Sequence, residues 1–380
     1  MYYKFKPEFC GHEVVGSQIV INGCLYIKSL KGIEHLNGNL KGLKLINCYR
    51  LTDISSIAFV DSITNLVIKN CTRLVFTDAL RYLVRVNSFS IDNYNMLIPA
   101  TVGAENNYAL LTYVSLRNCN ALKSTVEFGR FLSLVELRIN SCLNLVSLRG
   151  IEMLKNLRIL RVSYCNNLTN LNGIYQLTLT ILSICYCNRI ASLDPVAWPR
   201  PMLDPVAWPR TMATAQGPAL LSKMPRPAVA TPLGPAKLLT SLILYSVGLQ
   251  NLSGLEHFTE LTHLSLRYCT NLASLNELQY FHKLIDLDLT DCVTLRSIEI
   301  IVKLRNLEFL RLQNCTNLKF IPENIICLKN LKEMCIKGCC NLSPKLLFAS
   351  CDNDNDKDKI FQVLTSVVKN DASLWILPQA

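Results

Sequence analysis

Cysteine is the residue type in this sequence with the widest chemical repertoire, and its spacing decides which chemistry is open to it. The chain has 380 residues and 17 cysteines, spread along its whole length. Thiolates ligate zinc, form disulfides and act as nucleophiles. The tightest group, Cys327, Cys335, Cys339 and Cys340, lacks the paired C-x-x-C spacing of a zinc site. Disulfide scaffolds concentrate their cysteines in far shorter chains. We therefore expect neither a metal site nor a disulfide framework.

Other catalytic or ligand-binding signatures are also absent from the sequence. No phosphate-binding G-x-x-x-x-G-K-S/T loop, G-x-S-x-G elbow or H-E-x-x-H helix occurs, and there are only 5 histidines. A calcium loop that began at Asp352 would need Gly at its sixth position and Glu at its twelfth. Those positions are Lys357 and Val363. The sequence therefore predicts a non-enzymatic protein that uses no cofactor.

The cysteines recur at a regular interval, which indicates the elements that hold them. One pattern, apolar-x-apolar-x-x-Cys-x-x-Leu, appears as LVIKNCTRL, LRINSCLNL and LRLQNCTNL. Its cysteine position is occupied by Cys24, Cys48, Cys71, Tyr94, Cys119, Cys142, Cys165, Cys187, Val247, Cys269, Cys292, Cys315 and Cys339. Apart from the step between Cys187 and Val247, successive members are 22 to 25 residues apart. This is the period of leucine-rich repeats, about 20–29 residues.

The repeat predicts a curved solenoid. Its apolar-x-apolar core is a strand of period two that buries two side chains. Later apolar residues, such as Leu148, Ile151, Leu154 and Leu157, return the chain along the other side. One such unit cannot bury its own apolar face, so neighbouring units must stack. We therefore predict an α/β fold, a leucine-rich-repeat horseshoe with a parallel β-sheet on its concave face and short helical or irregular convex segments.

Eleven of the cysteines belong to the repeat, and we interpret them as structural. They stand where many leucine-rich repeats carry asparagine, and a thiol is small, weakly hydrogen-bonding and readily buried. Cys185 and Cys335 lie within strands, and we expect both to face the concave side, with Cys185 exposed and open to modification. The cysteines outside the register are Cys10, Cys185, Cys327, Cys335, Cys340 and Cys351.

The chain divides into one repeat domain and three atypical segments. We assign residues 1–18 to an N-terminal cap, 19–342 to the solenoid, and 343–380 to an acidic turn and a capping helix. The segment 194–236 interrupts the solenoid and contains ten of the 15 prolines, so we predict that it loops out. Its Pro232-Leu-Gly-Pro235 motif formally fits a polyproline ligand.

Strand alternation predicts which side chains line the concave face. Arg117, Arg138 and Arg161 come from three consecutive repeats, and we expect them to stack into a basic stripe. Arginine and tyrosine are enriched at binding hot spots, so we predict a protein partner with an acidic surface. The predicted partner-binding residues are Lys69, Arg117, Arg138, Arg161, Tyr113, Tyr164, Tyr186, Tyr245, Arg267, Tyr268, Asp286, Asp288 and Arg311. The aspartates of this set, with Asp291, are expected to form an acidic patch.

Charge and hydropathy restrict the class of partner and the cellular compartment that we expect. The formal net charge is +11. Acidic residues interrupt the basic ones and no nucleic-acid-binding motif is present, so we expect no nucleic-acid partner. No apolar run reaches the ~18 residues of a membrane span, and the N-terminal segment lacks the apolar core of a secretory signal. The sequence therefore predicts a cytoplasmic protein, with the nucleus as an alternative, whose thiols stay reduced.

One stretch carries a family resemblance. The sequence LEFLRLQNCTNLKFIPENIICLKNLKEMCIKGCCNL, at residues 307–342, resembles the C-terminal repeats of plant nucleotide-binding leucine-rich-repeat immune receptors. This resemblance implies protein recognition in defence signalling, although the ATPase module of that family is absent. Two alternatives stay open: a substrate adaptor of a ubiquitin ligase, suggested by Leu51-Thr52-Asp53 after Cys48, and a regulatory scaffold subunit.

Overall fold

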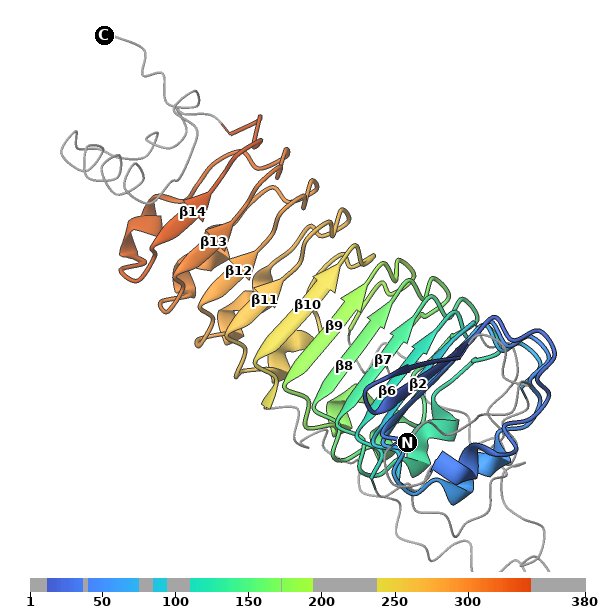
Figure 1. Ribbon diagram of the computed structural model, residues 1–380. Coiled ribbons are helices and arrows are strands. Elements are labelled where there is room, and N and C mark those ends of the chain that lie inside the picture. The colour runs from blue at the N-terminus through green and yellow to red at the C-terminus, as the bar shows by residue number, and fades with distance from the viewer. Residues whose placement is uncertain are drawn as a thin grey trace, which may run out of the picture.

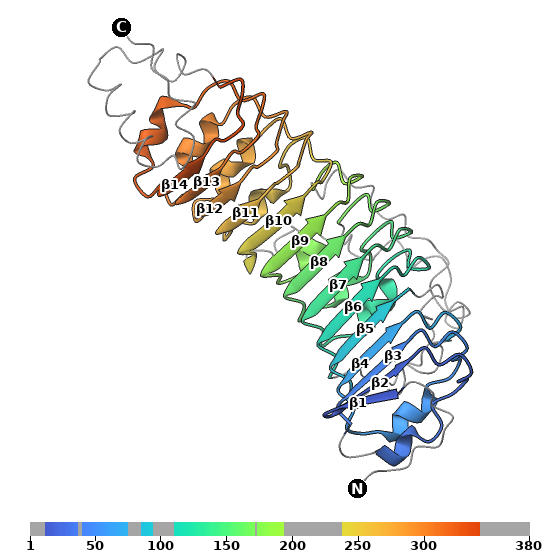
Figure 2. The ribbon, with the colours of Figure 1, turned by 45° about the horizontal axis from the view of Figure 1, so that its top comes forward.

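The computed structural model describes residues 12–36, 40–74, 85–93, 110–171, 173–193 and 238–342. They form an elongated, gently curved stack in which each coil adds one strand to a single sheet (Figures 1 and 2). The strands are β1 (His12–Val15), β2 (Gln18–Asn22), β3 (Gly42–Ile46), β4 (Asn65–Lys69), β5 (Ser88–Asp92), β6 (Tyr113–Arg117), β7 (Glu136–Asn140), β8 (Ile159–Ser163), β9 (Ile181–Cys185), β10 (Ser241–Tyr245), β11 (His263–Ser265), β12 (Asp286–Asp288), β13 (Phe309–Arg311) and β14 (Glu333–Cys335).

Strand order in the sheet is the order in the sequence. All strands from β2 onward are parallel, and β1 alone is antiparallel to its neighbour, β2. The predicted leucine-rich-repeat horseshoe is thereby confirmed. The domain boundaries stay predictions, because the insertion at 194–236, the segment 343–380, Cys10 and Cys351 lie outside the described residues.

Short 3-10 helices occupy the part of the coil that returns the chain to the next strand. They are η1 (Ile33–Leu36), η2 (Ser55–Phe59), η4 (Val126–Arg130), η5 (Ile151–Met153), η6 (Ile174–Gln176), η9 (Leu255–His257), η10 (Asn276–Tyr280), η11 (Glu299–Lys303) and η12 (Glu323–Cys327). The returning residues Leu148, Ile151, Leu154 and Leu157 are fully buried, as their spacing predicts. They close the core from the side opposite the strands.

From β2 onward, each strand buries its second residue, and each five-residue strand also buries its fourth. In β8, Leu160 and Val162 are buried, whereas Ile159, Arg161 and Ser163 are partly exposed. The same alternation holds in most described strands, because side chains of a strand point alternately to its two faces. One face of the sheet therefore belongs to the core, and the other stays open.

The chain turns sharply at the residue between the strand and the cysteine position. This residue has a positive φ in the described coils, and at Asn47, Asn70 and Asn93 it is asparagine, which tolerates left-handed backbone. Nδ2 of Asn70 donates to Oδ1 of Asn47 at 2.7 Å, and Nδ2 of Asn93 donates to Oδ1 of Asn70 at 3.1 Å. These side chains join successive coils along the edge of the open face.

The cysteine that follows the turn enters the core, as the repeat predicts. All eleven cysteines of the register are buried, and none forms a disulfide. Sγ of Cys339 donates to the Leu312 carbonyl at 2.9 Å, and Sγ of Cys315 donates to the Leu289 carbonyl at 3.2 Å. These two thiols therefore hydrogen-bond a carbonyl of the preceding coil, whereas the thiols of Cys142 and Cys165 hydrogen-bond a carbonyl of their own coil.

The solenoid keeps its register across the predicted insertion. β9 pairs directly with β10, so that Ile181 lies opposite Ser241 and Cys185 lies opposite Tyr245. The strands on either side of the interval between Leu193 and Leu238 are therefore neighbours, and they form one continuous face.

Gly150 offers a test of how tightly the returning segments pack. We expect Gly150→Ala to destabilise the solenoid by about 2–4 kcal/mol, measured by urea denaturation. Gly150 has a φ of 96°, its N–H donates to Oε2 of Glu152 at 2.8 Å, and a Cβ here would clash with the backbone of Val126.

Gly32 is the matched control for this substitution. It has a φ of 100°, and its N–H donates to Oε2 of Glu34 at 2.8 Å, but a Cβ there would meet nothing within 4 Å. Gly32→Ala should therefore cost only the backbone strain, about 1 kcal/mol. If both substitutions lower the free energy of unfolding equally, the clash with the Val126 backbone does not contribute to the effect of Gly150→Ala.

Candidate recognition surface on the open face of the sheet

The open face carries the predicted partner-binding residues. It is made of the first, third and fifth residues counted from the start of each strand from β2 onward, and the sixth residue lies at the sharp turn. We call these the first, third, fifth and turn positions. Because parallel strands stand in register, residues at the same position in successive coils form rows across the sheet.

Four tyrosines form a continuous row across β8, β9, β10 and β11. The ring centroids of Tyr164 and Tyr186 are 4.4 Å apart with nearly parallel planes. Tyr186 and Tyr245 are 4.8 Å apart, and Tyr245 and Tyr268 are 4.9 Å apart. We call these four residues the tyrosine row. Tyr113 does not belong to it, since it is the first residue of β6.

Three members of the tyrosine row adopt an uncommon backbone conformation. Tyr164, Tyr186 and Tyr268 occupy the turn position with φ of 54° to 57°. Left-handed backbone costs a bulky residue ~1 kcal/mol, whereas asparagine, found there at Asn70 and Asn314, tolerates it. The fold itself does not need tyrosine at this position. Residues held in unfavourable backbone regions cluster at functional sites, which makes the row a candidate binding site.

Arg138 and Arg161 lie side by side and share one carboxylate. They occupy opposite third positions in β7 and β8. Nε of Arg138 donates to Oε1 of Glu136 at 2.7 Å, and Nε of Arg161 lies 3.6 Å from the same oxygen. The bond to Glu136 raises the pKa of the Arg138 guanidinium. That guanidinium also lies 5.4 Å from the ring centroid of Tyr113, within range of a cation–π contact.

The predicted stripe of three arginines is wrong in one member. Arg117 occupies the fifth position of β6 and lies opposite Asn140, whereas Arg138 lies opposite Ser115. All three arginines reach the same face, but two residues along a strand separate Arg117 from the row of the others by ~6.6 Å. Its side chain is exposed and has no ion pair or hydrogen bond within the described part of the chain. Lys69 differs, since its Nζ lies 3.8 Å from Asp92.

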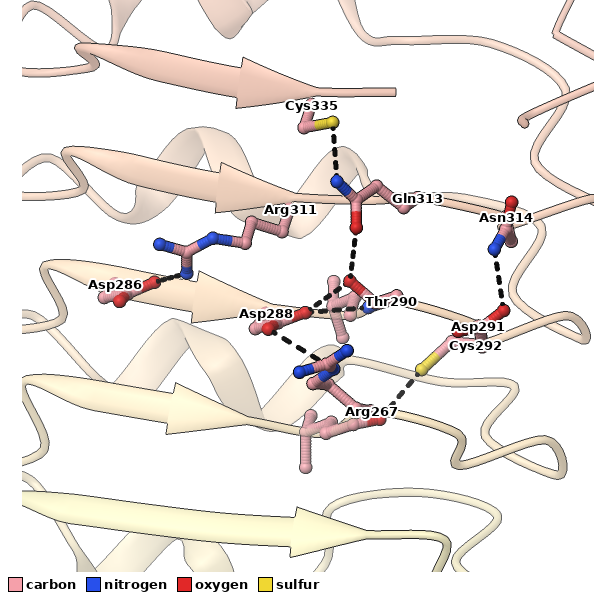
Figure 3. A network of polar contacts seen from close by, with 12 residues as sticks. Arg267, Asp286, Asp288, Thr290, Asp291, Cys292, Arg311, Gln313, Asn314 and Cys335 are labelled. Carbon is pink, nitrogen blue, oxygen red and sulfur yellow. Dashed lines mark hydrogen bonds and ion pairs between the residues drawn. The ribbon is translucent and has the colours of Figure 1, made fainter. Parts of the chain in front are cut away.

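The predicted acidic patch is also wrong, because arginines of neighbouring strands pair with it (Figure 3). Nη1 of Arg311 donates to Oδ1 of Asp286 at 2.6 Å, and Nε of Arg267 lies 3.8 Å from Oδ2 of Asp288. Oδ1 of Asp291 accepts a hydrogen bond from Asn314. The sequence places these residues correctly on the open face, but their charges largely cancel there.

A chain of hydrogen bonds extends this network to the last strand (Figure 3). Thr290 donates from its hydroxyl to Oδ1 of Asp288 at 2.6 Å, and its hydroxyl lies 3.5 Å from Oε1 of Gln313. Nε2 of Gln313 donates to Sγ of Cys335 at 3.0 Å. Cys335 therefore faces the open side, as expected, and its sulfur is already engaged as an acceptor.

The other thiols outside the buried register differ in exposure. Cys185 is half-buried rather than exposed, because it lies between Ser163 and Tyr245 on the neighbouring strands, and its sulfur is 3.5 Å from the Ser183 hydroxyl. Cys340 is exposed. In the described part of the chain, no three His, Cys, Asp or Glu side chains are grouped to hold a metal ion. The same residues include no helix that is long and apolar enough to cross a membrane.

Sequence reasoning missed Glu136. Its carboxylate neutralises part of the predicted basic stripe, since it contacts both Arg138 and Arg161. The signal was present, because Glu136 precedes Arg138 by two residues and two residues return a strand to the same face. With Glu136 counted, the arginines of β6, β7 and β8 leave this region of the open face with a net positive charge.

Comparisons with known proteins agree with the repeat architecture. The family model of the leucine-rich-repeat domain of the endo-β-N-acetylglucosaminidase EndoS matches residues 236–321, less than a quarter of the chain. The fold is a leucine-rich-repeat solenoid. No curated protein matches the sequence significantly.

Several solved structures are similar to this chain at low identity. An internalin, InlF, from Listeria monocytogenes is 17% identical with a TM-score of 0.44, and the match covers 86% of this chain and 85% of that one. A leucine-rich-repeat protein of Leptospira interrogans is 18% identical with a TM-score of 0.40, covering 92% and 88%. The functional domain of InlJ from Listeria monocytogenes, which includes a cysteine ladder, is 16% identical with a TM-score of 0.35, covering 84% and 67%. At these identities the likeness concerns the fold alone.

Proposed function

We propose that this protein is a non-catalytic recognition module that binds a protein partner on the concave, open face of its sheet. The observation that carries the proposal is the tyrosine row. Three of its members accept an unfavourable backbone conformation to hold aromatic rings on a surface that needs none for folding. Tyrosine and arginine are the residues that most often dominate binding energies at interfaces.

The charge of the same face favours a partner with an acidic surface. Arg117 is exposed and free of ion pairs within the described residues, and Arg138 and Arg161 share the single carboxylate of Glu136. Charged groups at an interface set the rate of association and the choice of partner more than the affinity itself. An acidic partner would therefore be steered to the region of β6, β7 and β8, next to the tyrosine row.

The biological setting remains a proposal drawn from the sequence. The resemblance to plant immune receptors favours defence signalling in the cytoplasm or the nucleus, and the alternatives are a ubiquitin-ligase adaptor and a regulatory scaffold subunit. Mass spectrometry of the proteins that this chain captures separates the three alternatives. An immune signalling protein supports defence signalling, a ligase core supports the ubiquitin-ligase adaptor, and a phosphatase supports the regulatory scaffold subunit.

Arg117→Glu tests the recognition surface. We expect this variant to lose the captured partner, with its affinity falling about 30-fold, because a charge reversal at a hot spot costs about 2 kcal/mol. Arg117 has no ion pair in the described structure, so the fold should be unaffected. The measurement is biolayer interferometry with the captured protein at low and high salt, and the loss should shrink as salt rises.

Lys123→Glu is the matched control for the recognition test. Lys123 is exposed, follows the buried Leu122 beyond the turn, and lies outside the strands of the open face. Lys123→Glu makes the same change in charge as Arg117→Glu, but away from the proposed surface. The affinity for the partner should therefore stay within about twofold of that of the unsubstituted protein. If Arg117→Glu and Lys123→Glu bind alike, Arg117 does not contact the partner and the proposed pairing with an acidic partner surface is wrong.

A further inference from the structure

The tyrosine row has a period that narrows the chemistry of its partner. Its rings stand on four adjacent strands, and neighbouring strands are about 4.8 Å apart. Alternate rings therefore repeat every ~9.6 Å along the solenoid. A polyproline II helix has three residues per turn and rises 3.1 Å per residue, which gives ~9.3 Å per turn. A ligand in this conformation would stay in step with every second tyrosine over the length of the row.

The surface shape of the tyrosine row also suits a ligand in the polyproline II conformation. Tyr164 and Tyr186 are nearly parallel, with an interplanar angle of 11°, but Tyr186 and Tyr245 are inclined by 53° and Tyr245 and Tyr268 by 44°. Inclined rings make a corrugated apolar surface, and polyproline segments dock on grooves lined by aromatic rings. Such segments are already ordered before binding, so they lose little conformational entropy on docking.

One end of the row carries a positive charge that has no ion pair among the residues that the structure describes. Arg117 occupies the fifth position of β6, two strands before Tyr164 on β8. Two strand spacings are again ~9.6 Å, or about one polyproline turn. Asn140, on the strand between them, is neutral, and its Nδ2 donates to the Ser163 hydroxyl at 2.6 Å. The ligand position one turn beyond the first tyrosine therefore faces Arg117.

We propose that the tyrosine row binds a proline-rich segment of a partner protein in the polyproline II conformation, with an acidic side chain about one turn beyond the prolines paired to Arg117. The segment reads acidic-x-x-Pro-x-x-Pro along the row, in one chain direction or the other, since polyproline ligands present similar surfaces both ways. This inference rests on the proposed function, because it assigns a ligand chemistry to the same face.

Synthetic peptides provide the test. One peptide carries Glu before about eight prolines, a second carries Glu after them, and a third and fourth replace Glu by Lys. Isothermal titration with the full chain should give a Kd of about 10–100 μM for one of the Glu peptides, typical of a short, pre-ordered ligand. Its Lys counterpart should bind at least about tenfold more weakly.

Tyr186→Asn separates binding from folding. Asparagine is the residue that other coils use at this turn position, as at Asn47 and Asn70, so the variant should fold with little change in thermal stability. It removes the ring between Tyr164 and Tyr245, and we expect affinity for the Glu peptide to fall at least about tenfold. Tyr280→Asn is the control, since Tyr280 is exposed on η10 and lies outside the row.

Arg117→Glu gives a result that a purely structural role would not produce. It should reverse the preference, so that the Lys peptide binds more tightly than the Glu peptide. Absence of binding by every peptide at ~1 mM, or binding that survives Tyr186→Asn, overturns the polyproline inference. If the peptides overturn the polyproline inference but Tyr186→Asn still loses the captured partner, the recognition surface stands and only the proposed ligand chemistry is wrong. Should that variant and Arg117→Glu both retain the partner, the proposed function fails as well.

Discussion

Cys142→Arg is expected to abolish cooperative folding of the central coils. Cys142 is fully buried, and its Sγ donates to the Asn140 carbonyl at 3.5 Å. A guanidinium at this place would be a buried, unpaired charge in a tightly packed core, which costs at least about 4 kcal/mol. Far-UV circular dichroism and limited proteolysis should show loss of structure around β7. Because each coil contacts only its neighbours, the damage should spread outward from that strand.

The same substitution at an exposed thiol is the control. Cys340 is exposed, so Cys340→Arg should change the free energy of unfolding by no more than about 0.5 kcal/mol. Cys142→Ala supplies a second reference, since it removes the thiol without adding charge and should cost about 1 kcal/mol. Soluble Cys142→Arg protein that resists protease as well as Cys340→Arg does would contradict the assignment of the cysteines to the core.

Alkaline pH is expected to destabilise the solenoid steeply. Burial raises the pKa of the Cys269 thiol from 9.0 to about 11. Burial, followed by the charge of Cys269, also raises the pKa of Cys292. Below pH 9 both thiols are protonated in the folded and unfolded chain. Above it the unfolded chain releases protons that the folded one retains, so the free energy of unfolding falls by ~1.4 kcal/mol per pH unit for each thiol. For Cys269 the loss is complete near pH 11, at about 3 kcal/mol.

Urea denaturation at pH 7, 9 and 10 would measure this loss. Lysines and tyrosines titrate in the same range, so the thiol contribution must be isolated by substitution. In Cys269→Ala, the free energy of unfolding should fall less steeply above pH 9, by the slope that corresponds to about one proton. Cys340→Ala removes an exposed thiol and should keep the slope of the unsubstituted protein. Identical slopes in the two variants would mean that the buried thiols do not govern the alkaline transition.

Several features of the site could be read from the sequence because they depend only on local spacing. The distance of a residue from the repeated cysteine sets its position in the coil. Arg117 precedes its cysteine by two residues, whereas Arg138 and Arg161 precede theirs by four. Counting from the cysteine would therefore have separated Arg117 from the other two. The prediction of a common stripe considered only which face the side chains reach.

Other features depend on which side chains of neighbouring coils meet. Arg267 and Arg311 reach across to Asp288 and Asp286, so what reads as an acidic patch is a set of ion pairs. Glu136 likewise serves two arginines at once. These contacts depend on rotamers and on the register between strands that are more than twenty residues apart in the sequence, and neither follows from the residue types alone.

The sequence by itself determined the solenoid, its buried thiols and the face on which arginines and tyrosines lie. Its period of 22 to 25 residues and its alternation within strands are local properties, and only a stack of coils can bury the apolar residues they align. The tertiary structure decided that Tyr186 and Tyr245 are neighbours, since β9 pairs with β10 across the interval at 194–237. It also decided that the Arg117 side chain has no ion pair within the described residues. Both outcomes arise because pairing between strands brings together side chains that the order of the chain keeps apart.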